Sequence, residues 1–201
     1  MVHALVVLSA FASQYALPEH TGVEAGASTL ILNEFMVLPV SASTQNAGQW
    51  VEIHNNSRNW VNLAGWSLVN HRGDIHLFGT FMLPPEGYFV LGGSSSYNDN
   101  GGYTPNAVWS GFSLAANGEL TLYSPMQDYY EKVQWNSSWP VQYGASCERI
   151  NPGWDSGLSS SWGLSQSTFG NGDFGTPGTL NSIYSNSFVQ NSWAFIKAFM
   201  N

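Results

Sequence analysis

Residues 49–70, with the sequence QWVEIHNNSRNWVNLAGWSLVN, constrain the fold more than any other stretch of the chain. In the run WVEIH, Val51 and Ile53 point to one side of an extended chain and Glu52 and His54 to the other, which is the alternation of a β-strand with two unlike faces. The polar run NNS that follows can hydrogen-bond its own backbone and turn the chain. Apolar alternation then resumes in WSLV. The stretch predicts two buried strands joined by a polar loop, as in a β-meander.

Short motifs of the same strand-and-turn character continue along the chain. They are LNEF at 32–35, WVEIHN at 50–55, VNLAGWSL at 61–68, LPPEGYFV at 83–90, GELTLY at 118–123, VQW at 133–135, GAS at 144–146, ER at 148–149, Trp162, GTPG at 175–178 and Asn181. Together they resemble the lamin tail domain in its bacterial and archaeal form, over residues 29–181. The resemblance implies an all-β, immunoglobulin-like β-sandwich. Domains of this type act mainly as extracellular or nuclear-envelope binding modules, and the family has no shared catalytic residues, so the resemblance implies that the protein is not an enzyme.

The composition narrows the classes of partner. The length of 201 residues suggests one domain with extensions. Charged residues make up 9% of the chain, against about 25% in ordinary soluble domains, so Ser, Asn, Gly, Gln and Thr must form most of the surface. Such a surface is typical of secreted or assembled proteins, and we expect an exported protein at the cell surface or outside the cell. Five basic against thirteen acidic residues argue against a nucleic-acid ligand, because phosphate binding needs clustered Lys and Arg.

The chain divides into four segments. Residues 1–16 hold an apolar run that ends in small residues, and the form small-x-small at 10–12 is typical of a signal-peptidase site. This segment is therefore either a signal peptide or, because only His3 precedes the run as a basic group, a hydrophobic arm of the mature protein. Residues 17–28 read as a linker, 29–181 as the sandwich and 182–201 as an apolar tail. No transmembrane segment is evident in the sequence.

The apolar tail suggests assembly. Its large side chains recur every three or four residues, which predicts one apolar face of a helix, and strand pairing of the same residues is the alternative. The tail should dock on its own sandwich, on a neighbouring copy or, least plausibly, on a membrane. We expect a structural or adhesive protein that forms a homo-oligomer, filament or surface layer. The candidate assembly residues are Leu5, Val6, Val7, Phe188, Trp193, Ile196 and Phe199.

An alternative function is a binding module for a glycan or a surface protein. The Gly- and Ser-rich residues 92–105 form a long loop, and binding residues concentrate on such loops. Exposed aromatic side chains can stack on sugar rings, although packing in the core is the commoner fate of a Trp. Trp50, Trp60 and Trp66 lie in the central motifs and are predicted to be core. The candidate ligand-binding residues, all in loop-rich sequence, are Trp109, Trp139, Trp154, Tyr97 and Tyr103.

Catalytic and metal sites find little support in the sequence. Glu34, Glu52 and His54 could be combined into an acid–base set, but we expect these carboxylates to tie strands and loops together through hydrogen bonds. The run YNDNGG at 97–102 has too few acidic oxygens for a calcium loop and is predicted to be a polar turn. No metal or other cofactor is expected. The single cysteine, Cys147, excludes an intramolecular disulfide and is predicted to be a buried thiol.

Overall fold

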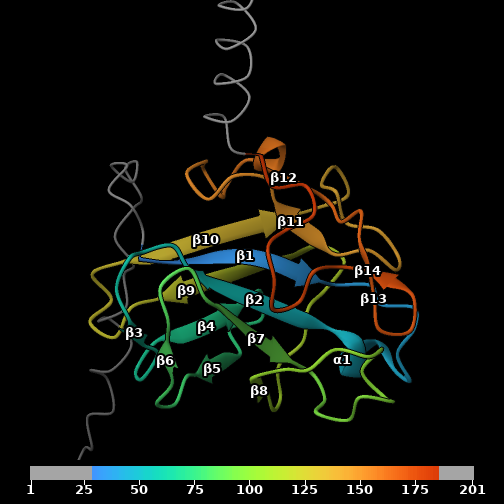
Figure 1. The fold of residues 1–201 in the computed structure, drawn as a ribbon, viewed down its shortest axis with the longest axis horizontal. Coiled ribbons are helices and arrows are strands. Elements are labelled where there is room, and N and C mark those ends of the chain that lie inside the picture. The colour runs from blue at the N-terminus through green and yellow to red at the C-terminus, as the bar shows by residue number, and fades with distance from the viewer. Residues whose placement is uncertain (1–28, 186–201) are drawn as a thin grey trace, which may run out of the picture.

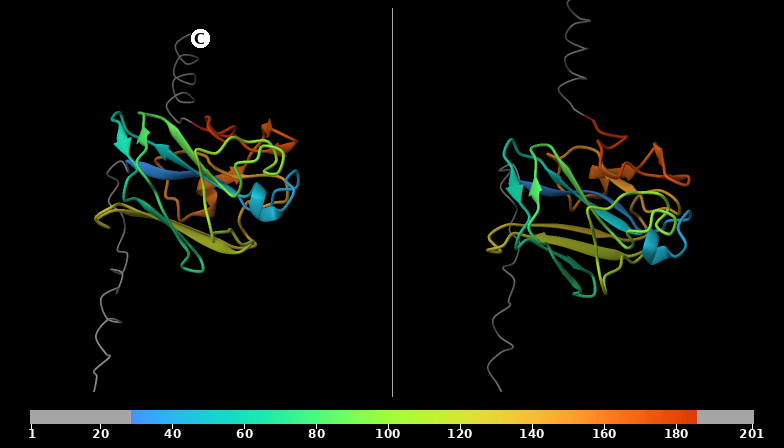
Figure 2. Two further views of the ribbon diagram at one scale, coloured as in Figure 1. Left: turned by 90° about the horizontal axis from the view of Figure 1, so that it is seen from below. Right: turned by 60° about the horizontal axis from the view of Figure 1, so that its bottom comes forward.

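The computed structural model describes residues 29–185, which fold into a β-sandwich of two facing sheets (Figure 1). The larger sheet has six strands in the spatial order β12 (Trp162–Leu164), β11 (Cys147–Arg149), β1 (Leu30–Met36), β2 (Trp50–Asn55), β7 (Tyr88–Gly92) and β8 (Ala107–Val108). The smaller sheet has four strands in the order β10 (Tyr130–Trp135), β9 (Gly118–Tyr123), β4 (Ser67–Asn70) and β5 (Ile75–Leu77). Figure 2 shows the sheets stacked, with the orange-red C-terminal part of the described chain on the outer side of the larger one.

Short elements complete the described chain. Two further two-stranded ladders are β3 (Val61–Asn62) with β6 (Met82–Leu83), and β13 (Thr168–Phe169) with β14 (Asp173–Phe174). A 3-10 turn spans Ser159–Ser161. The helix α1 (Gln45–Gly48) begins after Thr44, whose hydroxyl oxygen accepts a hydrogen bond from the backbone N of Ala47 (3.2 Å) and so caps it.

The main core lies between the two sheets. Alternate residues of the strands point inward, so that Val51 and Ile53 of β2 face the core as the sequence predicts. The ring of Phe35 stacks on Trp135 of the opposite sheet, with 4.7 Å between centroids, and meets the edge of Trp162 at 5.2 Å. This arrangement confirms the predicted all-β, immunoglobulin-like sandwich. Cys147 also points into this core, and burial raises the pKa of its thiol well above the ordinary value.

A β-bulge in β1 sets which residues reach the outer face. The pairing of β1 with β2 shifts register between Leu32 and Glu34, which leaves Asn33 outside the regular ladder. Leu32 and Phe35 both face the core as a result, while Glu34 points to the outer side of the six-stranded sheet. The bulge thus places a carboxyl and an amide, side by side, on the face that the C-terminal part of the domain covers.

The tryptophans of the central motifs have different fates. Trp66 belongs to the main core, and Trp50 is buried in a second, smaller core on the outer face of the six-stranded sheet. Trp60, however, is 61% exposed, so the prediction that it is core is wrong. The physical reason is local: Trp60 precedes the two-residue strand β3, which pairs only with β6 and belongs to neither large sheet.

Several predictions fall outside residues 29–185. The N-terminal arm or signal peptide (1–16) and the linker (17–28) lie there, as does most of the tail. All candidate assembly residues, from Leu5 to Phe199, are in these segments and stay predictions. Between residues 29 and 185, no helix is long and apolar enough to cross a membrane.

Candidate functional site

The outer face of the six-stranded sheet is covered by residues 165–183, which we call the clasp. Backbone hydrogen bonds hold the start of the clasp to the sheet: Ser165 donates to Ser146 O (3.1 Å), and Phe174 donates to Gly144 O (2.8 Å). Ser146 in turn donates to Phe174 O (2.9 Å). The rest of the clasp, including the GTPG motif, is held by side chains that rise from the sheet.

Three carboxylates occupy neighbouring positions beneath the clasp. Glu34 on the central strand β1 is paired in register with Glu148 of β11 on one side and with Glu52 of β2 on the other. All three side chains point to the outer face and are fully buried. Cross-strand neighbours lie close together, so the cluster is a row of three acidic groups across three strands.

Glu34 and Glu148 share one hydroxyl of the clasp. Thr176 Oγ1 lies 2.8 Å from Glu34 Oε2 and 3.0 Å from Glu148 Oε1. Glu34 also accepts hydrogen bonds from Ser146 Oγ and from the backbone N of Thr176 (2.9 Å). On the far side, Glu148 accepts from Ser182 Oγ (2.9 Å) and from the backbone N of Ile183 (3.0 Å).

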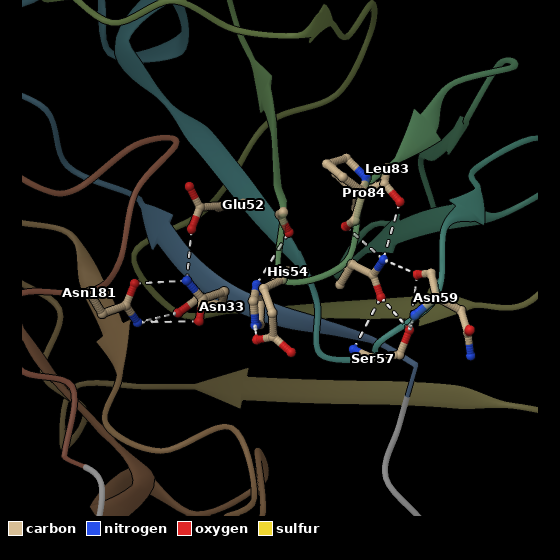
Figure 3. A network of polar contacts seen from close by, with 11 residues as sticks. Asn33, Glu52, His54, Ser57, Asn59, Leu83, Pro84 and Asn181 are labelled. Atoms are coloured by element: carbon tan, nitrogen blue, oxygen red, sulfur yellow. Dashed lines mark hydrogen bonds and ion pairs between the residues drawn. The ribbon is translucent and has the colours of Figure 1, made fainter.

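Glu52 holds the GTPG turn and the asparagine pair. It accepts hydrogen bonds from the backbone N of Gly178 (2.6 Å) and from Asn33 Nδ2 (2.7 Å). Figure 3 shows Asn33 between Glu52 and Asn181, whose side-chain oxygen accepts a second bond from Asn33 Nδ2 (2.7 Å). Asn181 Nδ2 donates to Arg149 O (2.8 Å), so the asparagine pair links the bulge in β1 to the neighbouring strand β11.

The cluster is short of positive charge. Its donors are hydroxyls, amides and backbone N–H groups, and between residues 29 and 185 none of the three carboxylates forms an ion pair. Burial, and after it the charge of Glu148, raises the pKa of Glu34 from 4.5 to about 8. Burial and then the charge of Glu34 raise the pKa of Glu52 well above its ordinary value. A protonated Glu34 can donate to Thr176 Oγ1, which then donates its own single proton to Glu148.

His54 does not join the carboxylates. It shares a face with Glu52, as the alternation predicts, but its Nδ1 lies 3.2 Å from Gly87 O and its Nε2 3.6 Å from Glu86. The ring stacks on Tyr88 at 4.6 Å, and burial lowers the pKa of His54. The hydrogen bonds of Glu34 and Glu52 confirm the prediction that these carboxylates tie strands and loops together. The sequence analysis assigned no role to Glu148, the third carboxylate of the row, although this residue belongs to the motif ER at 148–149.

A groove of about 490 Å³ opens beside the carboxylates, between the clasp and the 92–105 loop. Two of its lining residues, Tyr103 and Phe169, belong to the second core, in which they pack with Met36, Trp50 and Val90. The lining comprises residues 102–104 of the loop and residues 167–169, 175–177, 179 and 180 of the clasp. The predicted binding loop therefore forms one wall of a concave surface, and none of the candidate tryptophans lines it.

The predicted ligand-binding aromatics do not form one surface. Trp109 is buried in the main core, so its assignment to an exposed binding surface is wrong. Tyr103 is also buried and offers no exposed ring, but it lines the groove, and a contact between Tyr103 and a ligand stays a prediction. Tyr103 donates its hydroxyl to Gln49 O (3.0 Å) and packs on Trp50, while Trp109 packs on Phe112 in the main core because it continues the strand that pairs with β7.

The other three predicted aromatics are dispersed. Trp139 is half-buried against the main core, beside Trp162. Tyr97 and Trp154 are exposed, but they follow β7 and β11, which belong to opposite halves of the six-stranded sheet.

The loop residues 97–102 form the predicted polar turn: the side-chain oxygen of the buried Asn100 accepts a hydrogen bond from the backbone N of Gly102 (2.9 Å). Within residues 29–185, no three His, Cys, Asp or Glu side chains are grouped to hold a metal ion.

The fold and the buried polar row define the class of protein: an immunoglobulin-like β-sandwich closed on its outer face by its own C-terminal part. The chain belongs to the lamin tail domain family, because residues 23–137, more than half of its length, match that family. Glu34 and Glu52 lie inside the matched part, whereas Glu148 and the clasp follow it. No curated protein matches the chain. Lamin tail domains form a non-enzymatic family and often serve as binding or structural modules.

Proposed function

We propose that this protein is a non-catalytic structural or adhesive module, exported to the cell surface or beyond, which assembles with copies of itself. Three observations support the proposal. The chain belongs to a family of binding and structural modules, its charged content is only 9%, and apolar segments precede and follow the sandwich. Glu34 and Glu52, the acidic groups first considered for acid–base chemistry, are engaged beneath the clasp.

The observation that carries the proposal is the edge strand β5. It is the last strand of the four-stranded sheet in the described part of the chain, and its Ile75 and Leu77 are 66% and 68% exposed. Val69 of β4 is the register partner of Ile75 and is half-buried on the same face. An exposed apolar edge strand is a surface on which another chain can pair or pack, and soluble monomers usually protect such edges with charge. A neighbouring copy is the partner that a homo-oligomer provides.

The test is the mass of the full chain in solution, measured by sedimentation velocity over a range of concentrations. We expect an oligomer or polymer. The double variant Ile75→Lys with Leu77→Lys should shift the distribution toward the monomer, because it places two charges on the contact. Met126→Lys is the matched control, since Met126 is also exposed but lies in the turn between β9 and β10.

Removal of residues 1–28 or 186–201 separates the contribution of the extensions from that of β5. A full chain that stays monomeric at every concentration would refute self-assembly. Surface labelling of intact source cells tests export: protection of the protein from a label that cannot cross membranes would contradict it.

A further inference from the structure

The groove between the clasp and the 92–105 loop has an uncharged, hydroxyl-bearing lining. None of its lining residues is Asp, Glu, Lys, Arg or His. Thr104, Ser167 and Thr168 are exposed, and among residues 29–185 their hydroxyls have no hydrogen-bond partner. Each hydroxyl can donate one hydrogen bond and accept others. The groove therefore offers neutral donors and acceptors from two separate loops.

An aromatic ring and two apolar side chains complete the lining. Phe169 is half-buried, and its ring is fixed by edge contacts with Trp50 (6.1 Å between centroids) and Tyr103 (6.3 Å). Pro177 and the exposed Leu180 stand on the clasp side. Such a lining suits a ligand that has both an apolar ring face and many hydroxyl groups.

The two walls of the groove, the clasp and the 92–105 loop, contact each other directly through their backbones. Asn171 N donates to Gly101 O (2.9 Å), which joins the clasp to the 92–105 loop. The backbones touch so closely that a Cβ atom on Gly102, where φ is +94°, would lie 2.6 Å from the Cα of Gly170. A rigid groove loses little freedom on binding, which favours affinity even for a shallow site.

The clasp wall is anchored from below by the carboxylate row. Thr176, which lines the groove, bonds Glu34, and Gly178 beside it bonds Glu52. Behind the lining lies a donor with no acceptor among residues 29–185, the buried indole Nε1 of Trp50. The Cζ2 atom of the same ring lies 3.1 Å from the position of a Cβ on Gly175, which lines the groove. Trp50 packs against Phe169 and Tyr103, which both line the groove, so its indole signal can report changes in that lining.

We propose that this groove binds a neutral carbohydrate. Hydroxyls of the sugar would bond Thr104, Ser167 and Thr168, and the C–H face of a sugar ring would pack on Phe169. The volume of about 490 Å³ falls in the ordinary range of about 300–1,000 Å³ for ligand sites. Anionic ligands are disfavoured, because the lining has no basic group and the chain carries a net charge of −8. The proposal is independent of the self-assembly proposed above.

The experiment titrates the full chain with uncharged oligosaccharides (gluco-, manno-, xylo- and chito-hexaoses) and with an oligogalacturonate as the charged counterpart. Binding is followed by calorimetry and by the NMR signal of the Trp50 indole N–H. We expect saturable binding of at least one neutral oligosaccharide and a shift of the Trp50 signal. Ser167→Ala with Thr168→Ala should weaken binding by about tenfold or more, since two hydrogen bonds are lost.

The matched control is Trp154→Ala, which removes an exposed aromatic outside the groove and should leave binding unchanged. Because Ser167 and Thr168 are exposed, their variants should keep the unfolding midpoint of the parent chain, and this is measured for each. The proposal is overturned if no neutral oligosaccharide binds, if the oligogalacturonate binds in preference, or if Trp154→Ala abolishes binding while the hydroxyl variants retain it.

Discussion

The carboxylate row predicts that the domain loses stability as the pH rises from acid to weakly alkaline values. The pKa of Glu34 is about 8 in the folded protein against 4.5 ordinarily, so the folded state binds its proton more tightly than the unfolded state does. Between these two values unfolding releases a proton, and each unit of pH therefore lowers the free energy of unfolding. At about 1.4 kcal/mol per unit, the full interval corresponds to a loss on the order of 5 kcal/mol. The stability is fully present below pH 4.5 and is lost progressively up to about pH 8.

The perturbation is Glu34→Gln. The amide oxygen can accept the bonds from Ser146 and from the backbone N of Thr176, and the amide nitrogen can donate to Thr176 Oγ1, as a protonated Glu34 would. The variant should therefore match the parent at pH 5, within about 1 kcal/mol for the changed hydrogen bonds. At pH 9 it should be the more stable of the two, because it has no proton to lose. Burial still raises the pKa of Glu52 in this variant, although the charge of Glu34 no longer adds to it, so a smaller pH dependence should remain.

The assay is urea unfolding of the full chain at several pH values from 5 to 9, with Glu86→Gln as a control at an exposed carboxyl. Amide hydrogen exchange at Thr176 and Gly178 distinguishes local release of the clasp from global unfolding, since both N–H groups bond the carboxylates. The lowered pKa values of His54 and His76 act in the opposite direction below about pH 6.5, so the decisive interval lies above it. A parent protein whose stability does not fall between about pH 7 and 9, or a Glu34→Gln variant with an unchanged slope there, would refute the reasoning.

Two further predictions concern the core and the loops. Arg149 and Glu131 form a buried ion pair between the two sheets, so Arg149→Leu should lower the free energy of unfolding by about 3–5 kcal/mol. The double change with Glu131→Leu should cost less than the sum of the two single changes. A double-mutant cycle in urea measures these costs, and strict additivity would contradict the prediction. Gly93→Ala would place a Cβ 1.8 Å from Asn46 O and should cost at least the usual overpacking penalty of about 1–3 kcal/mol. Gly73 has open space around it and a φ of +79°, so Gly73→Ala should cost only about 1 kcal/mol of backbone strain. Equal shifts of the thermal unfolding midpoint for the two variants would contradict this prediction.

The sequence by itself determined the fold class and the faces of the strands. The alternation of Val51 and Ile53 with Glu52 and His54 depends only on the geometry of one extended strand, so it is readable without any partner. The short motifs extended this reading to the whole sandwich. They also led to the correct interpretation of Glu34 and Glu52 as structural groups. The faces of a single strand follow from local alternation, whereas the fold class is what the resemblance carried jointly by these motifs over residues 29–181 implies.

The exposure of single aromatics was not predictable. Tyr103 and Trp109 stand in loop-like sequence and are buried, while Trp60 stands in a central motif and is exposed. A residue's burial depends on which segment packs over it, and that segment can be distant in the chain. For Tyr103 it is the clasp, whose Phe169 packs against the same small core.

Only the tertiary structure decided which groups meet on the outer face. Glu34, Glu52 and Glu148 become neighbours because β1 pairs with both β2 and β11, and the row acquires its raised pKa values only when the clasp buries it. The groove exists for the same reason, because its walls come from the 92–105 loop and the clasp. The period of a strand tells which face a side chain occupies. It does not tell which strand lies beside it or what covers it, since both depend on contacts between residues far apart in the sequence.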